Sequence, residues 1–201
     1  MNTNHKAVVF DMDDVIVNLR EQVYRLFLKE HGDHIPDISD WYTYNVTKLF
    51  DISSKEEAFE LFQKHKVLEN ARPENYAFDL IRNYIHNDYR IFMVTSRGWH
   101  PHGTVVTEQW LRDYNLLEHI DNFYVTGMNE CKSEVLAMLM GNGFEIDHLY
   151  EDQMCNIDPC VNAGVVNKAY LINRPWNQDA KDNYQELFDS GKVEYYNGLT
   201  E

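Results

Sequence analysis

The sequence predicts an α/β fold in which a doubly wound parallel sheet carries a small helical cap inserted after its first strand. Three features of the chain predict this fold. An apolar run over 8–10 leads directly into a cluster of carboxylates, as expected of a buried strand that ends at a polar loop. Helical spacing of apolar residues then recurs over 18–72. From residue 90 onward, strand-like and helix-like segments alternate, which is typical of a parallel sheet with right-handed crossovers.

The first part of the chain contains the predicted strand and the predicted cap. Val8, Val9 and Phe10 are β-branched or aromatic and favour a strand. Asn18 followed by Glu21 has the form of a capping box and predicts a helix over about 18–31. The segment from His34 to Phe50 keeps neither periodicity, so we expect an irregular, aromatic loop there.

Two further helices are predicted before residue 90. Ser53 and Ser54 are each followed three residues later by a glutamate, which favours a helix start. Pro73 favours a first helical turn and predicts a helix that continues to Tyr84. The predicted division of the chain is a core of 1–17 and 73–201 and a cap of 18–72.

The remaining chain predicts the rest of the sheet and the helices that cover it. The expected strands span 91–94, 123–125, 148–150 and 169–172. The expected helices span about 103–115 and 132–142, a short stretch before Gly164, and a surface segment from Asp179 that precedes a short extended tail. No internal repeat interrupts this order.

Composition and charge exclude several classes of protein. The 201 residues suffice for one sizeable core but not for two full domains. The net charge of −15 argues against an extended interface with polymeric nucleic acid. No segment approaches the roughly 20 apolar residues that cross a bilayer. The N-terminus lacks the apolar core of a signal peptide, and the three cysteines lack ligand spacing, so we expect a reduced, cytoplasmic protein.

Polar residues follow the ends of four predicted strands or open the helices behind them. They are Asp11 and Asp13, Thr95 and Ser96, Lys132, and Glu151 and Asp152. The carboxyl ends of parallel strands meet at one edge of a sheet, so we expect these groups to converge. Neighbouring carboxylates repel one another unless a cation offsets them, and Mg²⁺ is the usual cation beside phosphate. A turn or a helix cap would explain any one of these clusters. Because all four occupy equivalent places at strand ends or helix starts, a functional site is favoured.

The order of these clusters resembles motifs I to IV of the haloacid dehalogenase (HAD) superfamily, over nearly the whole chain. Within that superfamily the sequence is similar to the 5′(3′)-deoxyribonucleotidases of the bacterial and phage type. The segments that carry the resemblance are DMDDV at 11–15, TSR at 95–97, EDQMCNID at 151–158 and INRPWN at 172–177. The resemblance implies a HAD-like core with a small helical cap between the first two motifs.

The resemblance also implies a Mg²⁺-dependent phosphatase that hydrolyses deoxyribonucleoside 5′-monophosphates through an aspartyl-phosphate. Asp11 would be the nucleophile, and Asp13 would protonate the leaving oxygen and later activate water. Asp11, the Asp13 carbonyl and Asp152 would hold the metal, with Glu151 as a ligand through water. The expected partner is therefore a small-molecule nucleotide, and related nucleotidases often form homodimers.

Phosphate binding would come from three more motif positions. Thr95 and Ser96 would donate hydrogen bonds to the phosphoryl oxygens, and Lys132 would supply a positive charge beside Asp11. Lys132 is chosen by its order in the chain, and the alternative is a solvated residue at a helix start. Two positions within the motifs depart from the family pattern. Asp14 stands where many members have Gly, and Arg97 replaces a Pro and either contacts phosphate or faces solvent.

Recognition of the base is the least constrained part of the prediction. Leu19 occupies a position where related nucleotidases carry an aromatic residue that stacks on the base. The aromatic residues of the cap that could replace it are Trp41, Tyr42, Tyr44 and Phe50. Stacking on a base needs only an exposed aromatic face, but the same rings could form the core of the cap.

Two other functions fit the same residues. One is a HAD phosphatase that acts on another small phosphorylated metabolite. The other is a non-catalytic, receiver-like phosphoacceptor module, which also has acidic residues, a Thr or Ser and a Lys on a doubly wound sheet. Such modules are usually shorter and lack an inserted cap. The sequence leaves the base preference and the position of the phosphate open.

Overall fold

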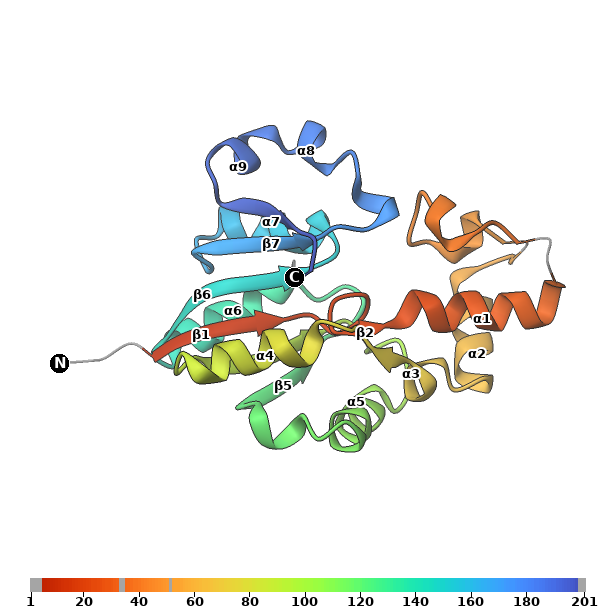
Figure 1. Cartoon of the computed structure of the whole chain (residues 1–201), viewed down its shortest axis with the longest axis horizontal. Helices are drawn as coiled ribbons and strands as arrows, with labels where there is room; N and C mark the ends of the chain where they lie inside the picture. Colours follow the sequence, from red (N-terminus) through yellow and green to blue (C-terminus); the bar gives the residue numbers. More distant parts are fainter. Residues whose placement is uncertain (1–4, 33–34, 51, 199–201) are drawn as a thin grey trace.

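A six-stranded parallel sheet forms the centre of the computed structural model, which describes residues 5–32, 35–50 and 52–198 (Figure 1). Its order is β5-β4-β1-β6-β7-β8. The strands are β1 His5–Phe10, β4 Arg90–Thr95, β5 Asn122–Val125, β6 Phe144–Glu151, β7 Lys168–Ile172 and β8 Val193–Tyr196. The chain winds from β1 to β4 and β5 on one side and then returns to β6 on the other. The predicted doubly wound α/β fold is therefore confirmed, and the carboxyl end of β1 lies where the winding reverses.

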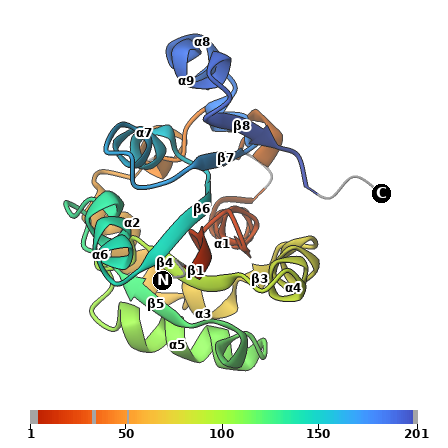
Figure 2. The same cartoon turned by 90° about the vertical axis from the view of Figure 1, so that its left-hand side faces the viewer.

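Helices cover both faces of this sheet. They are α4 Ala77–His86, α5 Gly103–Asp113, α6 Lys132–Gly141 and α7 Met154–Asn162. Val8 and Phe10 of β1 pack against α4 and α5, whereas Ala7 and Val9 pack against α6 and α7. Figure 2 shows α4 on one side of the strands and α6 and α7 on the other. Both faces of β1 are buried, which explains its uninterrupted apolar run.

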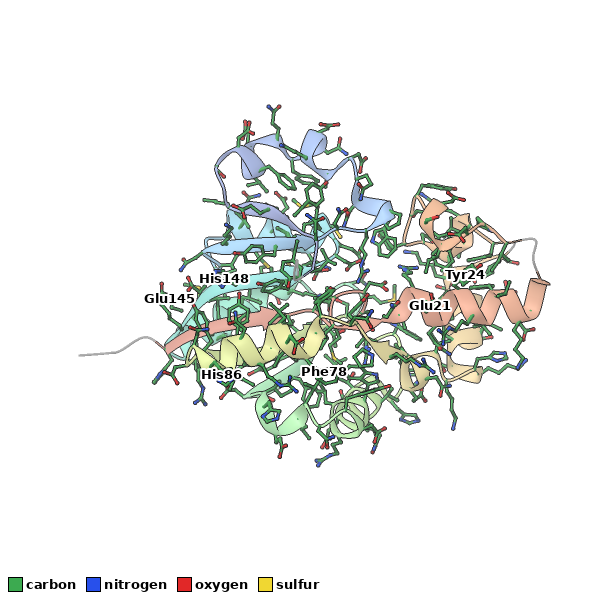
Figure 3. All side chains as sticks on the ribbon, in the orientation of Figure 1. Glu21, Tyr24, Phe78, His86, Glu145 and His148 are labelled. Carbon is green, nitrogen blue, oxygen red and sulfur yellow. The ribbon has the colours of Figure 1, made fainter. Side chains whose placement is uncertain are left out.

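A helical cap of residues 19–71 stands beyond the carboxyl end of β1 (Figure 1). It contains α1 Leu19–His31, α2 Lys55–Lys64, α3 Val67–Asn70 and two 3₁₀ turns, Ile38–Asp40 and Val46–Lys48. Asn18 Oδ1 accepts a hydrogen bond from Glu21 N at 3.1 Å, which confirms the predicted start of α1. Figure 3 shows Tyr24 on the side of α1 that faces the first 3₁₀ turn, and its ring centroid lies 6.3 Å from that of Trp41.

A short antiparallel ribbon joins the cap to the core. Val17–Asn18 (β2) pairs with Arg72–Pro73 (β3), and Glu74 N donates to Ile16 O at 2.9 Å. The prediction that Pro73 opens a helix was therefore wrong, because this proline lies in the ribbon and α4 begins only at Ala77. The short helix α3 was not predicted.

The C-terminal part of the described chain completes the sheet. The predicted surface helix forms two pieces, α8 Ala180–Asn183 and α9 Gln185–Asp189. The predicted extended tail is β8, which pairs in parallel with β7 through Tyr170 and Glu194, among other residues. Within the described residues, no helix combines the length and the apolar character needed to cross a membrane.

Candidate active site

The predicted site residues converge where the strands end. Asp11 directly follows β1, and its backbone N donates to Tyr150 O on neighbouring β6 at 2.9 Å. Glu151 is the last residue of β6, and Asp152 follows it. One carboxylate oxygen from each of Asp11, Glu151 and Asp152 lies within 4.8 Å of the others, and all three residues are buried. Residues 140 positions apart in the chain thus form one acidic cluster at the sheet edge.

Lys132 is the cation of this cluster. Its Nζ lies 2.8 Å from Asp11 Oδ1 and 2.6 Å from Glu151 Oε2, and only 2% of the residue is exposed. Lys132 is therefore not a solvated residue at a helix start. Burial alone would lower the pKa of Lys132, but Asp11 and Glu151 favour the ammonium and raise that pKa overall. Lys132 is a fixed positive charge beside the predicted nucleophile.

The carboxylates outnumber the cations in this cluster. Burial raises the pKa of Asp11 to about 7, the positive charge of Lys132 opposes this shift, and the negative charge of Glu151 adds to it. Burial also raises the pKa of Asp152 well above its usual range, and Glu151, Asp14 and Asp11 add to that effect. Removal from water and mutual repulsion thus both disfavour the ionised cluster.

Asp152 fits the role of a metal ligand. Its Oδ2 accepts a hydrogen bond from Trp176 Nε1 at 3.0 Å, whereas its buried Oδ1 has no hydrogen-bond partner among the described residues. A hard divalent cation with oxygen ligands would satisfy this atom and offset the excess negative charge. Asp11 and Asp152 are the side chains that could hold it. Both oxygens of Glu151 are already engaged, by Lys132 and by backbone N–H groups of Asp152 and Gln153.

Asp13 is held outside this cluster by Arg97. Arg97 Nε donates to Asp13 Oδ2 at 2.9 Å, and Arg97 Nη2 donates to Asp13 Oδ1 at 2.5 Å. The Arg97 side chain is fully buried, whereas 20% of the Asp13 side chain is exposed. One of the two sequence interpretations placed Arg97 in solvent. That interpretation was wrong, because the side chain is buried. The sequence signal for Arg97 was its place directly after Thr95 and Ser96, where the resembling nucleotidases have Pro.

The hydroxyl groups of Thr95 and Ser96 lie at the end of β4, next to β1. Thr95 is buried, and its Oγ1 has no hydrogen-bond partner among the described residues, so it is free to donate to a phosphoryl oxygen. Ser96 Oγ lies 3.2 Å from Thr126 Oγ1. The threonine is thus the less engaged of the two predicted phosphate ligands.

Asp14 adopts the backbone conformation that favours glycine. Its φ is +61°, in the left-handed region, which Asp tolerates better than most residues. The buried Asp14 carboxylate accepts hydrogen bonds from Arg20 N at 2.8 Å and Arg20 Nε at 3.0 Å. Its carbonyl accepts from Arg174 Nη2 at 2.6 Å. Sequence reasoning assigned no role to either arginine, and their contacts stabilise Asp14 in a backbone conformation that favours Gly.

Two of the four predicted base-binding rings belong to the core of the cap. Trp41 is completely buried, and its Nε1 donates to Pro36 O at 3.2 Å. The Phe50 ring stacks on Phe27 with centroids 3.9 Å apart and packs edge-on against Trp41. Of the two alternatives for Trp41, a base-binding ring or part of the core of the cap, the structure supports the second, because the ring has no exposed face. Tyr42 is 67% exposed, and its hydroxyl donates to Lys48 O.

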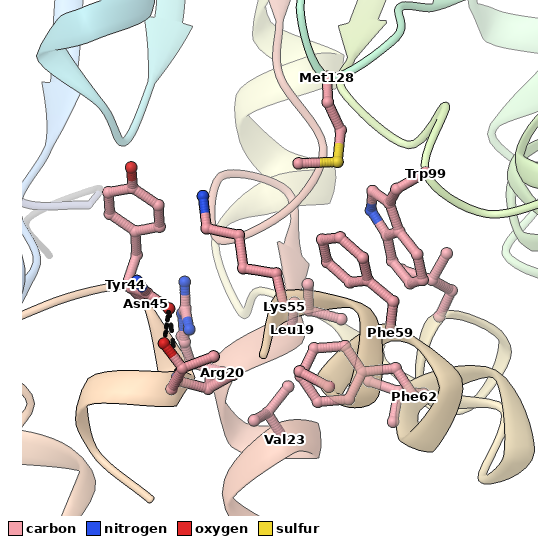
Figure 4. Close-up of a pocket in the computed structure, with 15 residues that line it drawn as sticks. Leu19, Arg20, Val23, Tyr44, Asn45, Lys55, Phe59, Phe62, Trp99 and Met128 are labelled. Atoms are coloured by element: carbon pink, nitrogen blue, oxygen red, sulfur yellow. Dashed lines mark hydrogen bonds between the residues drawn. The ribbon is translucent and has the colours of Figure 1, made fainter. Parts of the chain in front are cut away.

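A pocket of about 180 Å³ is lined by residues of the cap and by Trp99 and Met128 from loops of the core (Figure 4). Phe59 of α2 and Trp99, from the loop after β4, form one wall, with their rings stacked at 4.4 Å. Figure 4 shows the polar ends of Tyr44, Lys55 and Arg20 on the opposite side. Tyr44 lines this pocket and also a second hollow, which Asp152 lines, so the two hollows share a side chain.

Comparisons with known proteins place the fold. No protein-family model matches the sequence, and no curated protein does. A HAD-superfamily hydrolase structure from Ehrlichia chaffeensis is 16% identical, with a TM-score of 0.53 over 96% of this chain and 91% of that chain. A structure described as a predicted phosphoglycolate phosphatase from Haemophilus somnus is 15% identical, with a TM-score of 0.57 over 86% and 87%. A dehalogenase structure is 10% identical, with a TM-score of 0.62 over 98% and 95%. The chain has a HAD-like fold.

The HAD-like fold brings most of the motif residues together. Asp11, Lys132, Glu151 and Asp152 form one connected cluster, and Thr95 ends the strand beside it. None of the three structures above is described as a nucleotidase, so the likeness says nothing about the leaving group. The nature of the leaving group is inferred from the side chains that line the pocket.

Proposed function

We propose that this chain is a Mg²⁺-dependent phosphomonoesterase that hydrolyses deoxyribonucleoside 5′-monophosphates. The observation that carries the proposal is the buried cluster of Asp11, Lys132 and Asp152. A pocket with aromatic and cationic walls shares Tyr44 with the hollow that Asp152 lines. The proposed partner is a small nucleotide, since the chain has a net charge of −15 and would repel a polymer of phosphates.

The chemistry would proceed in two displacements. An Asp11 oxygen attacks phosphorus while the bond to the leaving oxygen breaks, and Asp13 donates a proton to that oxygen. Asp13 then takes a proton from water, which attacks the aspartyl-phosphate and releases inorganic phosphate. Lys132 keeps the Asp11 carboxylate in place, and the Thr95 hydroxyl donates to a phosphoryl oxygen. Mg²⁺ held by Asp11, Asp152 and the Asp13 carbonyl would offset the negative charge of the phosphoryl group.

The pocket beneath the cap supports a leaving group with a planar ring. A base could stack on the aromatic wall of Phe59 and Trp99, and such stacking tolerates any base. Lys55 makes no ion pair with any described residue, and its ammonium lies on the side of the pocket opposite Phe59 and Trp99. An ammonium donates only, so it favours bases with carbonyl acceptors, such as uracil and thymine.

Two observations weigh against other functions. A dehalogenase structure shares this fold, but dehalogenases differ from the phosphatases in lacking a counterpart of Asp13. Asp13 is present here and is paired with Arg97. A receiver-like module usually lacks an inserted cap, and residues 19–71 form one. A HAD phosphatase for another small metabolite is the main competitor, because the acidic cluster would serve any phosphate monoester.

A phosphate-release screen tests the proposal. Deoxyribonucleotides, ribonucleotides and sugar phosphates are incubated with the protein, with and without Mg²⁺, beside Asp11→Asn. We expect release from dUMP or dTMP that requires Mg²⁺, exceeds release from the ribonucleotides and is lost in the variant. Release from sugar phosphates alone would support the competing metabolite phosphatase. Stable phosphorylation without turnover would support the receiver-like module.

A further inference from the structure

We infer that Arg97 is a positioning residue that fixes the Asp13 carboxyl group for proton transfer to the leaving oxygen. The inference rests on the proposed phosphatase function and adds a residue to its machinery. Arg97 lies 84 positions from Asp13 in the chain, and the fold brings their side chains into a two-point contact. Such a fork fixes both the position and the plane of a carboxylate, which one hydrogen bond or a lysine would not do.

Arg97 is buried, and Asp13 supplies the opposite charge that it needs. The guanidinium has no exposed surface, and a buried charge is costly unless an opposite charge pairs with it. Among the described residues, Asp13 is the acidic side chain that forms an ion pair with Arg97. The Asp13 side chain keeps 20% of its surface exposed, so its pairing with Arg97 leaves part of the carboxylate accessible.

The rest of Arg97 is anchored to the core. Its Nη1 donates to the buried hydroxyl of Thr107 on α5 at 3.2 Å. A Cβ at Gly98 would lie 2.7 Å from Gly127 Cα, and a Cβ at Gly103 would clash with Arg97 O. The loop after β4 is therefore packed tightly against its neighbours through its backbone. Asp13 is thus held by a group that is itself fixed.

Arg97 acts through Asp13 rather than by binding phosphate. Its Nε and Nη2 donate to Asp13, its Nη1 donates to Thr107, and its side chain has no surface open to a ligand. Asp13 enters this step as the carboxylic acid and gives its proton to the leaving oxygen as the phosphorus–oxygen bond breaks. Arg97 transfers no proton and pairs with the carboxylate that this step leaves on Asp13. Loss of Arg97 should therefore impair proton donation while the attack by Asp11 continues.

Substrates that differ in their need for a proton test this role. We would measure kcat/KM for dTMP, whose leaving alkoxide needs a proton, and for p-nitrophenyl phosphate, whose phenolate leaves without one. Arg97→Met should lower kcat/KM for dTMP by roughly a hundredfold, within the range of general acid catalysis, and by less than about tenfold for p-nitrophenyl phosphate. Equal losses on both substrates would overturn the inference and indicate a purely structural role.

A double-mutant cycle shows whether Arg97 works through Asp13. In an Asp13→Asn background, the added Arg97→Met change should lower dTMP hydrolysis by less than about threefold, because the positioned acid is already absent. Full additivity of the two losses would contradict the inference. Arg112→Met is the matched control, since this arginine lies on the exposed side of α5 and pairs only with Glu108 in the described chain. It should retain wild-type activity.

A milder variant covers the case in which Arg97→Met does not fold. Thr107→Val keeps the ion pair but removes the acceptor of Arg97 Nη1. Thr107→Val should lower kcat/KM less than Arg97→Met does, and the decrease should again be larger for dTMP than for p-nitrophenyl phosphate. An equal decrease for both substrates would overturn the inference. If the wild-type protein releases no phosphate from either probe, the proposed function fails and this inference fails with it. An active wild type with unselective variants refutes the inference alone.

Discussion

Replacement of Lys132 by Met should destabilise the protein strongly in the absence of Mg²⁺. The Lys132 ammonium lies 2.8 Å from Asp11 and 2.6 Å from Glu151, and all three side chains are buried. Removal of one partner of a buried ion pair costs about 3–5 kcal/mol, because the remaining charge is left uncompensated. For a chain of this length, each kcal/mol corresponds to roughly 2–4 °C in the melting temperature. The expected decrease is therefore about 6–20 °C.

Thermal unfolding followed by circular dichroism, with EDTA or with Mg²⁺, measures this effect. Lys168→Met is the matched control, because Lys168 pairs with Glu194 at the surface, where 29% and 52% of the two side chains are exposed. Such a pair contributes at most about 1 kcal/mol. Mg²⁺ should recover part of the stability of Lys132→Met, since the cation offsets the same carboxylates. Equal melting temperatures for the two variants would refute the assignment of Lys132 as the fixed cation of the cluster.

Further predictions concern pH, the pocket and the cap. Burial raises the pKa of Asp11 to about 7, so the folded protein binds a proton that the unfolded chain has released. In EDTA, the free energy of unfolding should therefore fall as the pH rises from about 4 to about 7, and calorimetry should show a weaker dependence in Asp11→Asn. Lys55→Gln should raise KM for dTMP about two- to tenfold, and an unchanged KM would remove Lys55 from the pocket's function. Trp99→Ala should weaken nucleotide binding by about 1–3 kcal/mol, as measured by isothermal titration. Trp41→Ala should instead lower the free energy of unfolding by about 3–5 kcal/mol, with nucleotide affinity retained in the folded fraction.

The sequence alone predicted the elements that depend on local patterns. The alternation of strands and helices from β4 to β7 follows from apolar periodicity, and the starts of α1 and α2 follow from capping residues beside them. The carboxylates at the sheet edge followed from the same strands. These features need no knowledge of distant contacts.

Other features depended on contacts that no local pattern encodes. Arg97 and Asp13 are 84 residues apart, and nothing near either residue identifies its partner. Trp41 and Tyr44 are three positions apart in the same irregular segment, yet one is buried in the cap and the other is 45% exposed at the pocket. Pro73 favours a helix start locally, but its pairing with Val17 fixes it in a ribbon. In each case tertiary packing decided between two locally acceptable structures.

In the described part of the chain, the pattern of ion pairs leaves no unmatched cation in the acidic cluster for a phosphate to bind. Lys132 is shared by Asp11 and Glu151, Arg97 is paired with Asp13, and Arg20 is paired with Asp14. Each of these cations is already matched or exceeded by carboxylates, and Asp152 has no cationic partner among the described residues. A phosphoryl group would therefore meet net negative charge, and hydrogen bonds from Thr95 cannot offset repulsion between anions at close range. We therefore expect the proposed phosphatase to need a divalent cation for substrate binding as well as for the chemical step, so phosphate or vanadate should bind only when Mg²⁺ is present.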